Sequence, residues 1–385
     1  MTEPSSFPLP APLGGPPDLL VIAGEHSGDE HAARLVRGLL RLRPGLRVAA
    51  LGGPRLAAAG AQLLFDRTAM SVVGLAEVVR NLSFFRALIR ETVDWVAKNR
   101  PRAVCFVDNS GVNLRIAKEL RLRGISIKGG GSVRALYYIS PQIWASRAVR
   151  RFDMARNLDA LAVIFPFEVG AYGDTSLPVE FVGHPFLAPD YAPPVRYDPN
   201  GPLLLLPGSR PRAVDLIFPV IRDGFYEYSQ TNPGAQGVVL CPSNSIASFL
   251  VKMGVPERVS LRRAGAETVG ASAVLTTSGT MSMHCSLAGI PGAIVYKTDP
   301  LTYLVGKFLV RVPYLGIANI LLGQPMYPEF IQSEASPEAL AGQITECLGN
   351  PARQGRTAAQ AAELRALLAN PPGVNEADWL LRQLS

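Results

Sequence analysis

Apolar residues occur along the chain in short runs of strand length, and several of these runs are followed by a Gly-containing turn and an amphipathic stretch. This alternation predicts an α/β fold, in which parallel strands are connected by helices. In the first half of the chain we expect strands at Leu19–Ala23, Arg47–Gly52, Ala103–Val107, Ala135–Ile139, Ala160–Phe165 and Val179–Val182.

Proline is dense and the periodicity disappears in residues 185–202, which predicts a linker. The alternation begins again after it, with strands expected at Leu203–Leu206 and Gly237–Cys241 and a helix near Arg212–Tyr228. Because both halves begin with a strand, a Gly-containing turn and a helix, we expect two Rossmann-like domains facing one another across a cleft. The expected divisions are a disordered Pro-rich lead-in (1–17), an N-terminal domain (18–184), the linker (185–202), a C-terminal domain (203–370) and a C-terminal helix (371–385).

Two small-residue turns in the second half are candidate phosphate sites. One lies in Thr276–Asp299, where a strand, a Ser-Gly-Thr turn and a helix follow one another, so that backbone N–H groups and the positive helix end face the turn. The other is a Gly-Ser turn followed by Arg210, whose guanidinium can bind a diphosphate through two parallel hydrogen bonds. The candidate residues are Gly208, Ser209, Arg210, Ser278, Gly279 and Thr280. Ordinary turns and a surface Arg are the alternatives.

Two strand ends in the first half carry further candidates. The loop after the first strand contains Gly24, Glu25, Ser27, Gly28 and Asp29. Its glycines permit close backbone approach, and its Asp suits the N-cap of the helix that follows. Asp108 directly follows another strand, where open α/β sheets bind ligands, and is placed to act as a general base. A structural βα turn and a second helix N-cap are the alternatives.

The segment Met70–Val93 is unusually apolar and also contains Arg80, Arg86 and Arg90. An apolar face flanked by Arg is typical of a helix that lies in a membrane interface. A core helix of an α/β domain is the alternative. The residues assigned to the membrane-facing surface are Val72, Val73, Leu75, Val79, Leu82, Phe84 and Phe85.

Composition agrees with a large folded protein and favours an anionic partner. The 385 residues are 48% hydrophobic, enough for two cores, and Lys+Arg exceed Asp+Glu by 38 to 31, a formal charge of +7. The basic residues are scattered, so we expect no nucleic acid. The 4 cysteines lie far apart in mostly apolar runs, which predicts buried thiols in a reducing compartment and no metal site. No signal peptide and no membrane-spanning run of about 20 apolar residues is expected.

Six short motifs occur in an order that resembles the lipid-A-disaccharide synthase family. They are GEHSGD (24–29), YYISPQIWASR (137–147), FVGHP (181–185), LLPGSR (205–210), TSGT (277–280) and NILLG (319–323). The likeness extends from about Asp18 to near the C-terminus and includes PEFIQ at 328–332. It implies a GT-B fold and a glycosyltransferase.

In this family a UDP-linked diacylglucosamine donor glycosylates a diacylglucosamine 1-phosphate acceptor, with inversion and without a metal. The resemblance therefore implies a UDP-sugar donor, an acylated sugar or other lipid acceptor, and an anionic membrane surface as partners, with no further cofactor. It places the protein in the cytoplasm, bound peripherally to the inner face of the cell membrane. A homodimer is one assembly to test.

The resemblance also implies roles for individual residues. Asp108 matches the family's base, and Arg210 and the Ser278-Gly279-Thr280 turn match the diphosphate site, while the loop at 24–29 lines the acceptor side. Asn319 matches a polar residue of the cleft, and the segment at 70–93 matches a membrane-facing surface.

The chain departs from the family pattern at several positions. Gly111 and Ala213 each replace an acidic residue, and His284 replaces the glutamate expected to hold the ribose of UDP. Ala318 replaces a proline, and Lys128–Val133 is an insertion. A neutral His offers a single ring-nitrogen contact to a ribose hydroxyl, so we expect donor binding weaker by about 1–3 kcal/mol. Two alternatives follow: a transferase with a different sugar donor or lipid acceptor, and a non-catalytic relative that binds a nucleotide sugar or lipid.

Overall fold

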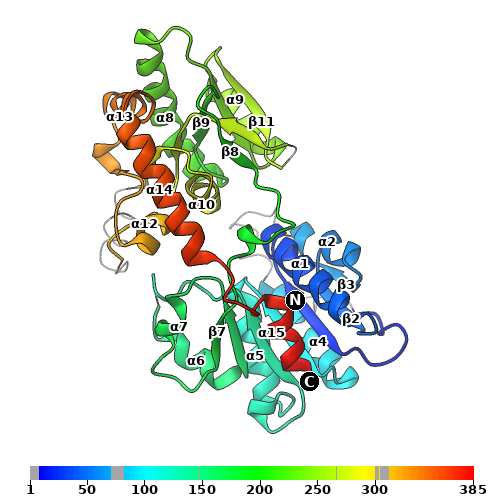
Figure 1. Ribbon diagram of the computed structural model, residues 1–385. Helices are drawn as coiled ribbons and strands as arrows, with labels where there is room; N and C mark the ends of the chain where they lie inside the picture. The colour runs from blue at the N-terminus through cyan, green and yellow to red at the C-terminus, as the bar shows by residue number, and fades with distance from the viewer. Residues whose placement is uncertain (1–7, 71–81, 146, 266, 300–302, 304–311) are drawn as a thin grey trace. The chain divides into compact units, whose positions relative to one another are not determined.

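The computed structural model describes residues 8–70, 82–145, 147–265, 267–299, 303 and 312–385. The chain divides into two compact units, one formed by Met1–Pro185 with Asn370–Ser385 and the other by Phe186–Ala369 (Figure 1). Each unit has its own parallel sheet and hydrophobic core. The α/β class expected from the alternating pattern is confirmed.

The sheet of the first unit has the strand order β3-β2-β1-β4-β5-β6-β7 within the described residues, and neighbouring strands are parallel. The strands are β1 Leu19–Ala23, β2 Val48–Gly52, β3 Gln62–Asp66, β4 Ala103–Val107, β5 Arg134–Tyr138, β6 Ala160–Val163 and β7 Val179–Phe181. Because β1 pairs with both β2 and β4, the strand order reverses there, and the loops after β1 and β4 leave the same edge of the sheet next to each other.

Helices connect these strands, and the longer ones bury an apolar face. They are α1 His26–Leu42, α2 Pro54–Ala58, η1 Thr68–Met70, α4 Leu82–Asn99, α5 Ser110–Leu122, η2 Ile127–Gly129, α6 Arg150–Asn157, α7 Glu168–Ala171 and α15 Glu376–Leu384, while η3 Pro185–Leu187 lies where the chain passes from the first unit to the second. In α5, for example, Ile116, Ala117 and Leu120 lie in the core, while the polar positions between them face outward.

The last helix, α15, belongs to the first unit although it follows the second along the chain. Figure 1 shows it beside α1, and the two pack so closely that a Cβ on Gly38 would lie 2.8 Å from the Cβ of Ala377. Trp379 is buried, and Arg382 forms an ion pair with Glu180 at 2.6 Å. The C-terminal helix is therefore not a separate segment. Its apolar face packs against the first unit, although the two lie far apart in the sequence.

The described part of the lead-in, residues 8–17, is also attached to the first unit. Leu9 packs against the core, and the carbonyl of Pro10 accepts a hydrogen bond from Trp95 Nε1 at 2.8 Å. The prediction of disorder is wrong for these residues, because Pro-rich composition does not reveal which partners their carbonyl groups find. Residues 1–7 lie outside the described residues.

The main sheet of the second unit has the order β11-β10-β9-β13-β14-β15 in the described chain, and again its strands are parallel. The strands are β9 Leu203–Leu206, β10 Gly237–Cys241, β11 Val259–Arg263, β13 Ala273–Thr276, β14 Gly292–Tyr296 and β15 Glu329–Ile331. The helices are α8 Pro211–Thr231, α9 Asn244–Lys252, α10 Thr280–Leu287, α12 Ile317–Leu322, η4 Gln332–Glu334, α13 Pro337–Gly349 and α14 Pro351–Leu368. Because β9 and β13 are neighbours, the order reverses between them, and the turns that follow these two strands are adjacent.

Part of the predicted linker is a strand of the second unit. β8 (Val195–Tyr197) pairs in parallel with β12 (Val269–Ala271). Val195 is buried, and so is Ala271. A strand of three residues among prolines is too short for its alternation to be recognised in the sequence.

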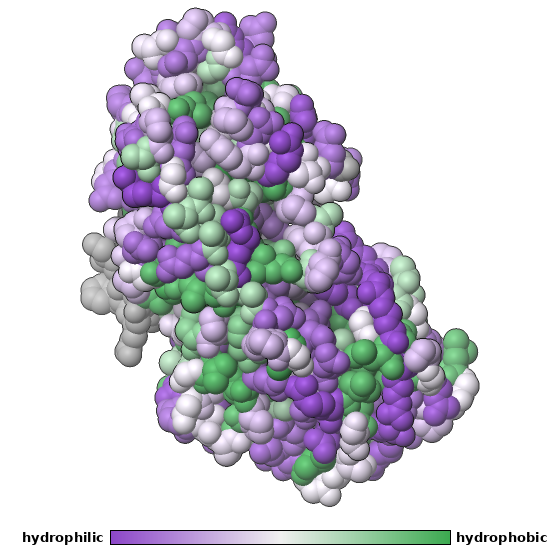
Figure 2. All heavy atoms as spheres, in the orientation of Figure 1, coloured by the Kyte–Doolittle hydropathy of each residue, from purple (hydrophilic) through white to green (hydrophobic). Residues whose placement is uncertain are grey.

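The surface agrees with the composition. On the face shown in Figure 2, hydrophilic residues predominate and hydrophobic residues form scattered patches, as is usual for folded domains. None of the helices in the described ranges combines the length and apolar character needed to cross a bilayer. The four cysteines are buried free thiols, as predicted from their apolar runs.

Candidate active site

The loop after β1 and the turn after β4 pack against each other at one edge of the first sheet. A Cβ on Gly24 would lie 2.0 Å from Nδ2 of Asn109, so only glycine permits this approach. Asp108 and Asn109 have positive φ angles of 49° and 42°, which are uncommon outside glycine and often occur at functional sites. The structure thus brings together two of the candidates from the sequence.

The backbone of Asp108 is held by its neighbours in the sheet and by α5. Its N–H donates to the carbonyl of Tyr138 at 3.1 Å. Its carbonyl accepts hydrogen bonds from the Tyr137 hydroxyl at 2.5 Å and from Asn113 Nδ2 at 2.9 Å. These contacts fix the backbone position of Asp108 and use its N–H and carbonyl rather than its carboxyl group.

The environment makes the Asp108 carboxyl a stronger base than an exposed aspartate. Burial raises its pKa, the backbone N–H of Asn109 opposes this effect, and the carboxylate of Glu25 adds to it. A general base works best when its pKa approaches the working pH. The direction of the shift therefore suits proton abstraction.

Arg67 is a buried cation that contacts Asp108 only through Asn113, and it was not among the sequence candidates. It is 5% exposed, and its Nη1 donates to Oδ1 of Asn113 at 3.2 Å, the same side chain that holds the Asp108 carbonyl. Burial lowers its pKa to about 10, whereas Tyr137 and Glu25 raise it. The sequence offers no signal for it, because Arg67 follows β3, a strand that was not predicted.

Glu168 is a second carboxyl missed by the sequence analysis. It is buried at the start of α7 and accepts hydrogen bonds from the backbone of Phe165 at 3.1 Å and from Trp144 Nε1 at 3.3 Å. Burial raises its pKa to about 8, against these hydrogen bonds. Because Trp144 lies in the YYISPQIWASR motif, Glu168 ties that motif to the end of β6.

Asp29 has a structural role that differs from the predicted one. The helix that follows β1 begins at His26, so Asp29 lies inside α1 and cannot be its N-cap. Its buried carboxylate accepts hydrogen bonds from the backbone N–H groups of Gly53 at 2.7 Å and Arg55 at 3.0 Å, at the start of α2. Glu25 and Ser27 are the exposed side chains of the predicted site in this loop.

In the second unit, the two predicted phosphate-binding turns lie side by side. The N–H of Thr277, just after β13, donates to the carbonyl of Leu206 at the end of β9, at 3.0 Å. Gly208 has φ of 112°, a conformation that favours glycine. A Cβ placed on it would lie 3.7 Å from the Thr277 hydroxyl. The adjacent strand ends therefore bring both turns to one place.

Both turns lead directly into helices. α8 begins at Pro211 after Arg210, and α10 begins at Thr280 after Gly279; neither N-cap residue supplies a side-chain hydrogen bond. The backbone N–H of Gly279 donates to Oγ of Ser282 at 3.3 Å. Arg210, Ser209 and Thr280 are exposed. Two helix N-termini and a guanidinium group at one sheet edge can bind a diphosphate.

His284 is buried in an aromatic cluster of the same unit. Its ring stacks on Phe186 at 4.0 Å between centroids and lies parallel to Tyr191, with an angle of 2° between the planes. Its Nε2 is 3.1 Å from the Tyr191 hydroxyl. One ring nitrogen is thus already engaged, and contact with a ribose stays a prediction.

Asn319 is fully buried, and its side-chain amide is fully used within the protein. Oδ1 accepts hydrogen bonds from the backbone N–H groups of Met326 at 2.8 Å and Tyr327 at 3.0 Å. Nδ2 donates to the carbonyl of Tyr327 at 2.7 Å and to Glu329 at 2.9 Å. The expected contact with a ligand is not available to this side chain, because its four hydrogen bonds hold α12 to β15.

Glu329, from the PEFIQ motif, extends this network to the phosphate-binding turn. Its carboxylate accepts hydrogen bonds from the backbone N–H groups of Leu315 at 2.9 Å and Gly316 at 2.9 Å, before α12. The carbonyl of Leu315 in turn accepts a hydrogen bond from the Ser278 hydroxyl at 2.6 Å. Glu329 was not a sequence candidate, although the motif that contains it was noted.

The predicted membrane-facing surface is only partly described. Val72, Val73, Leu75 and Val79 lie outside the described residues, and so does the side chain of Leu82. Phe84 is half-buried and packs on Phe65, with ring centroids 6.1 Å apart, and on Phe85, at 5.9 Å. Further along α4, Val93 and Val96 belong to the core. The described part of this segment is therefore a core helix on one face.

Comparison with solved structures gives the class of protein. A glycosyltransferase of kitacinnamycin has a TM-score of 0.58 and 16% identity, covering 96% of this chain and 100% of that one. The calicheamicin glycosyltransferase gives 0.54 and 14%, covering 96% and 98%. At these identities the likeness concerns the fold, which is that of GT-B glycosyltransferases. In the described residues, no group of three or more His, Cys, Asp or Glu side chains is arranged to hold a metal ion.

Sequence comparison then gives the family. The model of the lipid-A-disaccharide synthetase family matches residues 19–381. The lipid-A-disaccharide synthase of Geobacter sulfurreducens is 35% identical over 364 residues, covering 91% of this chain and 92% of the relative. That of Anaeromyxobacter dehalogenans is 35% identical over 366 residues, covering 92% and 94%. The chain belongs to the lipid-A-disaccharide synthetase family and is a glycosyltransferase, which confirms the resemblance carried by the six motifs.

Proposed function

We propose that the chain is a lipid-A-disaccharide synthase. It transfers acylated glucosamine from UDP-2,3-diacylglucosamine to diacylglucosamine 1-phosphate, with inversion at the anomeric carbon and release of UDP. The observation that supports this best is the family match over residues 19–381, within which both sheets carry candidate residues where their strand order reverses.

The second unit is proposed to bind the donor. Its two turns present backbone N–H groups from the starts of α8 and α10, and Arg210 is exposed beside them. These groups suit the diphosphate of UDP and the negative charge that develops on it as the bond to the sugar breaks. The aromatic cluster around His284 lies on the same unit and would flank the nucleoside.

The first unit is proposed to bind the acceptor and to supply the base. The Asp108 carboxylate takes the proton from the acceptor hydroxyl, and the oxygen attacks the anomeric carbon as the bond to the diphosphate breaks. UDP leaves with the bonding electrons, and Asp108 carries the proton away. Glu25 and Ser27, which are exposed beside Asp108, are the candidate contacts with the acceptor sugar.

We also propose that this reaction takes place at the cytoplasmic face of the inner membrane, where the chain is bound peripherally. Acylated substrates reside in the bilayer, and the formal charge of +7 favours an anionic surface. No metal ion is required in this scheme, since the helix N-termini and Arg210 neutralise the diphosphate. Assembly as a homodimer is a further proposal, to be measured by light scattering.

The substitution at Gly111 does not disturb the first unit. A Cβ at this position would meet nothing within 4 Å, so the space for a longer side chain is open in the first unit. Asp108 remains as the carboxylate two residues before the start of α5. We therefore propose that it acts as the base without a second carboxylate from the first turn of α5.

The proposal is tested with purified full-length chain, both substrates in neutral detergent, and measurement of UDP and disaccharide formed. We expect turnover by the wild type and a loss of about 10²- to 10⁴-fold in Asp108→Asn, which keeps the shape of the side chain but cannot accept the proton. Asp153→Asn, an exposed position on α6, is the matched control. Absence of UDP release by the wild type, or full activity of Asp108→Asn, would contradict the mechanism.

A further inference from the structure

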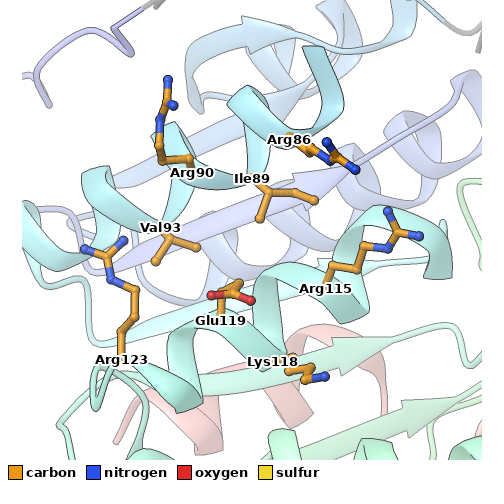
Figure 3. A pocket seen from close by; sticks show the side chains of 8 residues that line it. All are labelled: Arg86, Ile89, Arg90, Val93, Arg115, Lys118, Glu119 and Arg123. Atoms are coloured by element: carbon orange, nitrogen blue, oxygen red, sulfur yellow. The ribbon is translucent and has the colours of Figure 1, made fainter. Parts of the chain in front are cut away.

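A basic pocket lies between α4 and α5 on the first unit. It has a volume of about 390 Å³ and is lined by Arg86, Ile89, Arg90, Val93, Arg115, Lys118, Glu119 and Arg123 (Figure 3). Five of these eight side chains are cations and one is an anion. Ile89 and Val93 face α5 from α4 and make the centre of the pocket apolar. Such a lining combines positive charge with an apolar floor.

Two of the cations are already paired with carboxylates outside the pocket. Arg90 contacts Glu91 at 3.2 Å, and Arg123 contacts Asp94 at 2.6 Å. The second contact also fixes the alignment of the two helices, since it joins the C-terminal half of α4 to the end of α5. This end of the pocket is therefore largely neutralised.

The opposite end carries cations that have no such partner. Arg86 and Arg115 are exposed and extend from the two helices towards the same end of the pocket, and Lys118 follows one turn further along α5 (Figure 3). Within the described parts of the chain, none of the three has a hydrogen-bond or ion-pair partner. Three cations thus lie at this end, and the one carboxylate of the lining, Glu119, is not paired with any of them.

We propose that this end binds the phosphate of an anionic glycerophospholipid. The guanidinium groups of Arg86 and Arg115 hold the phosphate oxygens from the two helices, and Lys118 adds a point charge. Ile89, which is only partly buried, contacts the glycerol and the first methylene groups of the lipid, above the buried side chain of Val93. A free phosphate ion would leave the exposed part of Ile89 uncovered, which is why the lipid is the better match.

The pocket also has a suitable position in the first unit. The end with Arg86 and Arg115 lies towards the N-termini of α4 and α5, and α5 begins two residues after Asp108. A headgroup bound there would hold the sheet edge that carries the base close to the bilayer, where an acylated acceptor resides. The inference rests on the proposed reaction at a membrane surface, to which it adds a defined lipid contact.

The test compares two double variants that remove the same charge. Full-length wild type, Arg86→Gln/Arg115→Gln and the control Arg90→Gln/Arg123→Gln are sedimented with vesicles of phosphatidylcholine, with and without phosphatidylglycerol. We expect binding to vesicles with phosphatidylglycerol to fall at least about tenfold in the first variant and about threefold or less in the control, whose cations are already paired. Equal losses in the two variants would show diffuse surface charge and overturn the pocket, as would no loss in either.

A second measurement separates the lipid from a simple anion. Calorimetry with a soluble short-chain phosphatidylglycerol should show binding to the wild type and not to Arg86→Gln/Arg115→Gln, and inorganic phosphate should bind the wild type more weakly. Equal binding of the two ligands would overturn the lipid assignment. Turnover with substrates in neutral detergent is measured in parallel. An inactive wild type would contradict the proposed function itself, whereas an active wild type without discrimination between the double variants would contradict only the pocket.

Discussion

At the scale of single residues, two carboxyl groups with a raised pKa, the half-buried Asp108 and the buried Glu168, have different consequences. Asp108 and Glu168 both have a raised pKa, and burial is the main cause in each case. For Asp108 the shift suits its proposed role as the base, since the Asn109 backbone N–H is the one hydrogen bond to its carboxyl group among the causes of the shift. Glu168 instead binds the backbone of its own turn and Trp144, so its shift should influence stability.

Glu168 should make the first unit less stable as the pH rises. Its folded pKa of about 8 lies above the unfolded value of 4.5, so between these values the folded chain keeps a proton that the unfolded chain has lost. The free energy of unfolding should therefore fall by about 2 to 4 kcal/mol from pH 5 to pH 8. In Glu168→Gln this part of the pH dependence should disappear, as measured by urea unfolding. The control is Glu227→Gln, at an exposed position of the second unit. A wild-type slope retained by Glu168→Gln would assign the effect to another group.

Sequence motifs identify residues of the site but not what their polar atoms contact. Arg210 and Asn319 both lie in recognisable motifs, yet Arg210 is exposed, whereas the side-chain amide of Asn319 makes all its hydrogen bonds within the protein. The carboxylate of Asp29 likewise binds backbone N–H groups at the start of α2. Arg67 lies outside every motif, and only the fold brings it to Asn113, which holds the Asp108 carbonyl. Hydrogen-bond saturation depends on three-dimensional neighbours, which the spacing of residues along the chain does not contain.

At the scale of elements, the second unit contains a hydrogen-bond network that joins α12, β15 and the turn before α10. Asn319 connects α12 to β15, Glu329 binds the backbone before α12, and Leu315 receives the hydroxyl of Ser278. These contacts hold the turn before α10 in place through the Ser278 hydroxyl. Asn319 and Glu329 are therefore positioning residues for the proposed diphosphate site.

Removing the Asn319 amide should weaken both the fold and donor binding. Asn319→Ala leaves buried backbone groups of Met326 and Tyr327 without their partner, which should cost about 2 to 4 kcal/mol of unfolding free energy. The KM for the UDP-sugar should rise, while the KM for the acceptor stays unchanged. Asn232→Ala, which removes a partly buried amide near the end of α8, is the control. An equal change in both KM values would show a general loss of structure.

Most strands and helices were predictable because their apolar periodicity is long enough to be recognised. β1, β4 and β9 agree with the predicted runs at both ends. The short β8 and the strand β3 were missed, the first among prolines and the second with a half-buried pattern that does not alternate. Elements of three to five residues are stabilised by their sheet neighbours more than by their own pattern.

At the scale of the whole molecule, both units follow one plan but are assembled from the sequence differently. Each places its candidate residues where two adjacent parallel strands lead into separate helices. The second unit is a continuous segment, Phe186–Ala369, whereas the first needs α15 from the end of the chain. The stability of the first unit therefore depends on residues encoded after the second, a dependence that no local pattern reveals.

Truncating Trp379 should accordingly destabilise the first unit and leave the second unchanged. The side chain is 1% exposed, and its removal should lower the unfolding free energy by about 3 to 5 kcal/mol through lost burial and a cavity. In Trp379→Ala, hydrogen exchange followed by mass spectrometry should accelerate in peptides from β1 and α1 and not in peptides from β9 and α8. Gln383→Ala on the same helix should change neither set. Faster exchange in both units would mean that α15 stabilises the molecule as a whole, and unchanged exchange in β1 would show that the first unit folds without it.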